Sequence, residues 1–168
     1  MKPLEPPDCH HLRAASGWLE LNNPREAAAE LQQLSAAARM HPDTLEVLWQ
    51  LCAANQRWQE AVEFGRLLVR LQPSDPSGWL HRSYALHELR RTEEALTLLV
   101  PAAAQFPKES IIPYNLACYC CQLGKLDEAR AWLANAARLR GRDEIRRLAL
   151  ADSDLQPLWS EIAEWSES

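Results

Sequence analysis

Apolar and small residues recur along the chain at the spacing of an amphipathic helix. Within one stretch they stand at i, i+3, i+4 and i+7, positions that share one face of a helix. The pattern appears four times: His11, Ala14, Ala15, Trp18; Leu45, Leu48, Trp49, Cys52; Trp79, Arg82, Ser83, Leu86; and Pro113, Leu116, Ala117, Cys120. A second series follows each of these: Ala27, Leu31, Leu34; Ala61, Gly65, Leu68; Ala95, Leu99, Ala102; and Ala129, Leu133, Ala136. The pattern predicts two helices in each of four units, and sustained apolar–polar alternation, which would indicate strands, is nearly absent.

The units have a constant length. The dipeptide Glu-Ala occurs at positions 26–27, 60–61, 94–95 and 128–129, a separation of 34 residues each time. A fixed period of this size indicates a solenoid of stacked helix pairs. The repeats are predicted at 8–41, 42–75, 76–109 and 110–141.

These residues resemble the tetratricopeptide repeat, whose pattern is Trp-x2-Leu-Gly-x2-Tyr, then Ala-x3-Phe, then Pro. The third unit matches it in register, and the first is the weakest copy, with His11 at the aromatic position and Arg39 at the closing proline position. The matching positions of the third unit are Trp79, Ser83, Leu86, Ala95, Leu99 and Pro107. The resemblance implies an all-α solenoid of four antiparallel helix pairs in a right-handed superhelix. It also implies a protein that contacts other proteins through the concave groove, which the first helix of each pair lines.

The two ends of the chain fall outside the period. Residues 1–7 are expected to form a tail, and residues 142–168 a C-terminal cap that covers the last repeat. In the cap we expect a helix over 143–151, a turn at 152–154 and a second helix over 157–164. A competing interpretation is that Trp159 and Trp165 present an apolar surface for self-association.

Charge and hydropathy exclude several classes of function. The net charge of −5 argues against general nucleic-acid binding. The cluster of Arg138, Arg140, Arg142, Arg146 and Arg147 is expected to pair with local acids, and an acidic-partner or phosphate site is the alternative. Apolar runs are too short to span a membrane, and the first residues lack a signal-peptide pattern, so a cytoplasmic location is expected. The Arg- and Ala-rich, Lys-poor composition suits a GC-rich bacterial genome.

Catalysis, metals and cofactors are not expected. The five cysteines are predicted to be reduced thiols. Cys118 and Cys121 share one helix face but lack a redox setting, and four metal ligands cannot be assembled from nearby positions. The sequence contains no nucleotide-binding loop, no metalloprotease motif and no hydrolase nucleophile motif.

Two residues depart from the repeat pattern. Arg82 stands at an interior helix position, where its guanidinium needs an acid or a path to water. Pro101 stands inside a predicted second helix and is expected to bend it.

The candidate partner-binding residues lie one step around the first helices from the interior face. Aromatic rings with polar tips at two of these positions, and amides at others, suit an extended peptide or an inserted helix. The predicted groove consists of Arg13, Glu46, Gln50, Leu80, His81, Tyr84, His87, Tyr114, Asn115, Cys118 and Gln122. A structural interpretation also exists, in which Tyr84 and Tyr114 only pack against adjacent repeats. A chaperone-tail clamp is disfavoured, because the expected Lys and Asn positions match only at Asn115.

The function predicted from the sequence is a non-catalytic adaptor that binds a protein or peptide in this groove, as a monomer or weak homodimer. The alternative is a homo-oligomeric structural subunit that associates through the C-terminal cap. A more distant alternative is a cysteine-based metal or redox module.

Overall fold

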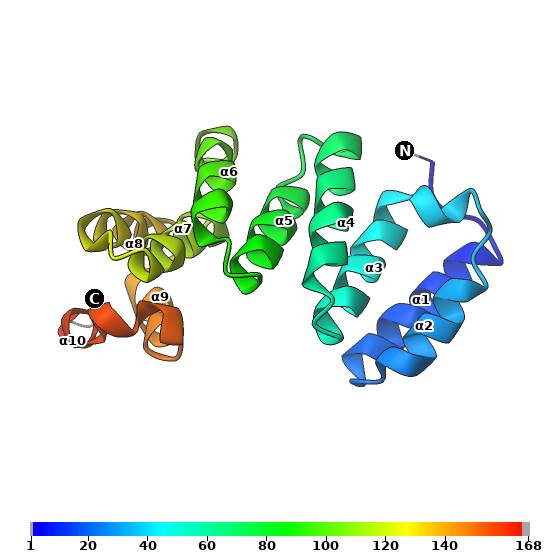
Figure 1. Cartoon of the computed structure of the whole chain (residues 1–168), viewed down its shortest axis with the longest axis horizontal. Helices are drawn as coiled ribbons and strands as arrows, with labels where there is room; N and C mark the ends of the chain where they lie inside the picture. The colour runs from blue at the N-terminus through cyan, green and yellow to red at the C-terminus, as the bar shows by residue number, and fades with distance from the viewer. Residues whose placement is uncertain (1, 166–168) are drawn as a thin grey trace. The chain divides into compact units, whose positions relative to one another are not determined.

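A computed structural model describes residues 2–165, and within this range all regular structure is helical. The α-helices follow one another along the chain, as the colours of Figure 1 show. They are α1 (Asp8–Glu20), α2 (Pro24–Gln32), α3 (Pro42–Ala54), α4 (Trp58–Leu71), α5 (Ser77–Glu88), α6 (Thr92–Gln105), α7 (Ile111–Gln122), α8 (Leu126–Arg140), α9 (Arg142–Leu150) and α10 (Trp159–Ala163). Two short 3₁₀ helices join them, η1 (Ala38–Met40) and η2 (Ser153–Leu158).

The turn inside each helix–turn–helix segment has the same backbone signature. One residue in each turn has a positive φ: Asn22, Gln56, Arg90 and Gly124, with φ of 55°, 55°, 61° and 73°. These positions are 34 residues apart. Only Gly124 takes this conformation without a steric penalty, because glycine has no Cβ. The period seen in the apolar residues therefore also holds in the backbone.

The start of α2 is capped by an asparagine. The Asn23 side-chain oxygen accepts a hydrogen bond from the Glu26 amide at 3.3 Å, and Pro24 occupies the first turn. Asparagine at this position satisfies one of the unpaired amides of a helix start, and proline there loses no hydrogen bond.

The chain divides into two compact units. Unit 1 comprises residues up to Ala85, and unit 2 begins at Leu86, so that the boundary falls inside α5. In unit 1, α1 packs against α2, α3 against α4, and α1 against α3. In unit 2, α7 packs against α6, α8 and η2, and α9 packs against α8 and α10.

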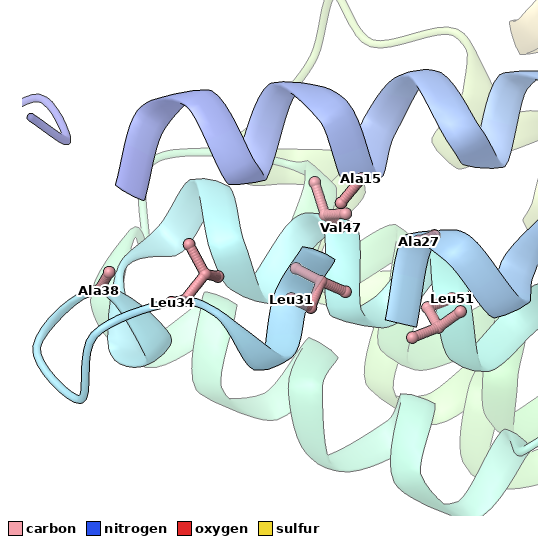
Figure 2. Packing of buried hydrophobic residues seen from close by; sticks show 7 residues of the cluster. All are labelled: Ala15, Ala27, Leu31, Leu34, Ala38, Val47 and Leu51. Carbon is pink, nitrogen blue, oxygen red and sulfur yellow. The ribbon is translucent and has the colours of Figure 1, made fainter. Parts of the chain in front are cut away.

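Small residues from the repeat pattern form much of the core. In unit 1, side chains from α1, α2, η1 and α3 meet in one cluster of Ala15, Ala27, Leu31, Leu34, Ala38, Val47 and Leu51 (Figure 2). The alanines of the four Glu-Ala pairs are all fully buried: Ala27, Ala61, Ala95 and Ala129. An alanine at this place lets two helix backbones approach closely while its methyl group is removed from water.

Helix α4 approaches α5 closely at Gly65. A Cβ placed on Gly65 would lie 2.7 Å from the Arg82 amide nitrogen and 2.8 Å from its Cα and Cβ. The Arg82 side chain is half-buried, and its Nε has no hydrogen-bond partner among the described residues. An arginine at an interior position is therefore accommodated by a glycine opposite its backbone.

The first repeat and α6 show how irregular positions are accommodated. Helix α2 ends early, and Arg39 donates hydrogen bonds to the carbonyl oxygens of Gln32 (3.1 Å) and Leu34 (3.2 Å). At the other irregular position, α6 continues from Thr92 to Gln105 with Pro101 inside it. Arg39 thus satisfies carbonyls at and just after the end of α2, at the position where the second and third repeats carry Pro73 and Pro107.

Candidate partner-binding surfaces

All eleven predicted groove residues lie on the first helix of a repeat. Arg13 is on α1, and Glu46 and Gln50 are on α3. Leu80, His81, Tyr84 and His87 are on α5, and Tyr114, Asn115, Cys118 and Gln122 are on α7. Six of them belong to unit 1, and five, from His87 onward, belong to unit 2. The two sets have different surroundings.

In unit 1 an aromatic cluster joins α3, α4 and α5. The rings of Trp49 and His81 stack with centroids 3.9 Å apart and planes at 14°, and the Trp49 indole N–H donates to the His81 carbonyl at 3.2 Å. Tyr84 meets Trp49 and Trp58 edge-on, with centroids 6.2 and 5.8 Å apart. Since Tyr84 is still 40% exposed, the cluster presents part of an aromatic ring to solvent.

A cavity of about 670 Å³ opens beside this cluster. Its wall includes Leu12, Arg13 and Ser16 of α1 together with Glu46 and Val47 of α3. Arg13 and Glu46 are the predicted groove residues among them. Glu46 also links the cavity to the aromatic cluster, because its carboxylate lies 2.5 Å from Nε2 of His81.

Other walls of this unit 1 cavity come from residues that the sequence did not indicate. Pro3 and Leu4 of the predicted tail line it, and so do Asp43, Asp75 and Ser77. Leu4 lies in the predicted tail, outside the repeat pattern, and the period therefore does not indicate its contact. With Asp43, Glu46 and Asp75 against Arg13, the wall carries an excess of negative charge.

In unit 2 the predicted groove residues contact the chain's own C-terminal region. The Tyr114 hydroxyl donates to Oδ2 of Asp152 at 3.0 Å, and the Cys118 thiol donates to the same oxygen at 3.5 Å. Nε2 of His87 lies 2.9 Å from Oδ2 of Asp154, and the Gln122 amide donates to the Asp154 carbonyl at 3.0 Å. The polar tip of Tyr114 is thus engaged by the chain's own C-terminal region.

These contacts change the acidity of two groups. Burial, with the negative charge of Asp152 close by, raises the pKa of Tyr114 and of Cys118 far above their ordinary values. Both groups therefore stay protonated at neutral pH and remain hydrogen-bond donors to Asp152.

The cysteines provide no assembled reactive site. All five are free, and Cys118, Cys120 and Cys121 are buried on α7. Burial raises the pKa of the Cys120 and Cys121 thiols as well, which disfavours the reactive thiolate. Among residues 2–165, no group of three or more His, Cys, Asp or Glu side chains is arranged to hold a metal ion.

Three arginines at the end of α8 and in α9 have separate local partners. Arg140 pairs with Glu144 at 2.7 Å, and the Arg142 guanidinium lies 5.2 Å from the Trp165 ring centroid. Arg146 donates to the carbonyl oxygens of Ile162 and Ala163. Trp159 is also used internally, since its indole N–H donates to the Ala149 carbonyl at 2.8 Å.

Unit 2 has a second hollow, of about 470 Å³, between α8, α9 and α10. Its wall is apolar at Leu133, Leu158 and Ile162, and Trp165 and Arg138 also line it. Arg130 at its edge is held by Glu161 through two hydrogen bonds of 2.7 Å.

No helix in the described part of the chain is long and apolar enough to cross a bilayer.

The stacked helix–turn–helix segments define the molecule as an all-α helical-repeat protein. A tetratricopeptide repeat model matches residues 12–76 and 80–144, so the chain belongs to the tetratricopeptide repeat family. The fold is that of a scaffold for protein–protein interaction.

Solved structures agree on the fold. TTC0263, a thermophilic TPR protein of Thermus thermophilus, is 23% identical with a TM-score of 0.74, over 92% of this chain and 82% of that one. MamA (residues 41 to the end) of Desulfovibrio magneticus is 15% identical with a TM-score of 0.72, over 96% of each chain. No curated protein matches the sequence.

Proposed function

We propose that this protein is a non-catalytic adaptor that binds a peptide segment of a partner protein, with unit 1 as the main binding surface. The observation that carries the proposal is the unit 1 cavity of about 670 Å³, whose wall includes residues of both α1 and α3, among them the predicted groove residues Arg13 and Glu46. A volume of this size accommodates several side chains of a bound segment.

The cavity wall favours a segment with basic and apolar side chains. Leu4, Leu12 and Val47 supply apolar contacts, whereas Asp43 and Asp75 supply negative charge. A lysine or arginine of the partner gains from those acids, and an aliphatic side chain beside it is removed from water. Arg13 offers a donor to a backbone carbonyl or to the carboxylate of an acidic residue in the segment.

Tyr84 extends this surface beyond the cavity. Its ring is held edge-on by Trp49 and Trp58, so little conformational freedom is lost when a partner packs on its exposed side. A rigid aromatic side chain that keeps a polar tip is typical of the residues that contribute most to binding.

The test is a selection from a library of random dodecapeptides displayed on phage, with full-length protein as bait. Two variants alter the surface: Ser16→Phe fills the cavity, and Tyr84→Ala removes the exposed ring. Leu71→Ala is the matched control, because Leu71 lies on α4 in the same unit and is 39% exposed, close to the 40% of Tyr84.

We expect selected peptides to be enriched in Lys or Arg next to aliphatic residues. Their affinity should fall at least about tenfold in both surface variants and remain unchanged in Leu71→Ala, since loss of an anchoring aromatic costs about 2 kcal/mol or more. Peptides that bind Ser16→Phe and Tyr84→Ala as well as wild type would place recognition elsewhere. A selection without any enrichment would refute peptide binding by this surface.

A further inference from the structure

The segment Asp152–Leu158 returns across α7 and contacts it in the manner of a bound peptide. Its first carboxylate, that of Asp152, accepts hydrogen bonds from the Tyr114 hydroxyl and the Cys118 thiol. The other oxygen of Asp152 accepts from the Asp154 amide at 3.0 Å, which fixes the turn at this point. One carboxylate thus both shapes the segment and attaches it to α7.

The second carboxylate of the segment has its own receiving group. Oδ2 of Asp154 lies 2.9 Å from Nε2 of His87, whose other ring nitrogen lies 3.0 Å from the Thr92 hydroxyl. His87 is only 7% exposed, and its ring packs on Tyr119 with centroids 4.9 Å apart. The imidazole is therefore held by Thr92 and Tyr119, and its remaining ring nitrogen faces the Asp154 carboxylate.

Backbone and apolar contacts complete the attachment. The Gln122 side-chain amide donates to the Asp154 carbonyl, so a main-chain group of the segment is also recognised. Leu155 and Leu158 are fully buried. The recognised pattern is Asp-x-Asp-Leu-x-x-Leu, in which two acids meet polar groups of unit 2 and two leucines are removed from water.

A simple cover for the end of a repeat array would need only the leucines. Partial removal of two carboxylates from water costs free energy unless they are hydrogen-bonded, and such contacts favour one ligand over others more than they add affinity. The four receiving residues, His87, Tyr114, Cys118 and Gln122, all stand at groove-facing positions of first helices.

We propose that this face of unit 2 is a binding site for acidic, leucine-containing segments, and that residues 152–158 are its intramolecular occupant. A partner that carries the same pattern binds by displacing them. This goes beyond the proposed function, because the site lies in a different unit and prefers a ligand of the opposite charge.

Because residues 152–158 belong to the same chain as their binding site, a competing peptide needs a high affinity or a high concentration to displace them. A segment joined by a short connection has an effective concentration on the order of 1 mM. A free peptide of equal intrinsic affinity at about 10 µM therefore occupies only about 1% of the sites. We therefore expect no detectable binding of such peptides to the wild-type protein.

The test releases the segment from the site and leaves the residues of the site unchanged. Full-length protein with Asp152→Lys and Asp154→Lys keeps His87, Tyr114, Cys118 and Gln122 but repels its own segment. A synthetic peptide with the sequence of residues 150–160 is then added while amide signals of α7 are followed by NMR. The control peptide carries Asn in place of both aspartates.

We expect the α7 signals to move in the variant, and the wild-type peptide to return them toward their original positions. The control peptide should bind at least about tenfold more weakly, because it lacks the charge on both acceptors. Wild-type protein should respond to neither peptide at the same concentration. Equal binding of the two peptides, or no binding by an opened site, would overturn the proposal.

If the lysine variant does not fold, Asp152→Asn with Asp154→Asn gives a milder test by hydrogen exchange. We expect the amides of residues 153–156 and of Leu158 to exchange about tenfold faster or more, while those of α7 and α8 do not change. Unchanged exchange in the segment would mean that Leu155 and Leu158 alone hold it, and the proposal would be wrong.

Discussion

Replacing Gly65 by alanine tests the close approach of α4 and α5. The new methyl carbon would stand 2.7–2.8 Å from three atoms of Arg82, two of them backbone. These atoms belong to a helix and cannot move singly, so the two helices must separate by about half an ångström or more to reach ordinary contact. Overpacking of this kind costs roughly 1–3 kcal/mol, and contact with backbone favours the upper end.

A gain in helix propensity opposes this cost. Alanine is more favourable than glycine inside a helix by about 1 kcal/mol. The net expectation for Gly65→Ala is therefore a loss of roughly 2 kcal/mol in the free energy of unfolding. Urea unfolding followed by circular dichroism should show a lower midpoint.

Gly17→Ala is the matched control, because it is the same substitution in a helix with no neighbouring atom within 4 Å of the new carbon. Only the propensity change applies there, so we expect α1 to gain about 0.5–1 kcal/mol. The two substitutions should therefore change stability in opposite directions. If Gly65→Ala is as stable as wild type or more so, the inferred contact between the helices is wrong.

Two further predictions concern a helix cap and alkaline pH. Asn23→Ala should lower the free energy of unfolding by about 1 kcal/mol, because the Glu26 amide loses its acceptor. Urea titration measures this loss. Asn55→Ala would be a poor control, because the Asn55 side chain also donates a hydrogen bond to a backbone carbonyl. Stability should also fall above pH 10. The pKa of Tyr114 is raised in the folded protein, so the unfolded chain releases this proton first, near its ordinary value of 10.0. The unfolded state then binds fewer protons, and stability falls by up to about 1.4 kcal/mol per pH unit. Tyr114→Phe should show a smaller fall between pH 9 and 11, and an equal fall would contradict the assignment.

The repeat architecture was accessible from the sequence because it depends on local periodicity. Ala61 and Ala95 stand at the same phase and are both buried, and Asn23 with Pro24 marks a helix start by its chemistry alone. Their surroundings repeat, so one unit predicts the next. Gly65 was recognisable as a small residue on the interior face, but its neighbour Arg82 could be identified only from the packed helices.

The surfaces were less predictable because they depend on segments outside the period. A turn and cap at residues 152–154 were expected, and Asp152 does accept from the Asp154 amide. Nothing in the spacing indicated that Asp152 also receives Tyr114, a contact across 38 positions of the chain. Leu4 likewise reaches the unit 1 cavity from a tail without periodicity. The groove residues remain predictions as partner contacts.

The positive-φ residue of each turn bears on how such a chain can diversify. The position holds an amide at Asn22 and Gln56, a cation at Arg90 and no side chain at Gly124, while the backbone conformation stays the same. The positive-φ position of the turn therefore accepts different side chains, and the turn can serve as a joint between helices with any of them. Charge can be added or removed there at a cost of roughly 1–2 kcal/mol relative to unstrained backbone, without altering the helices that the joint connects.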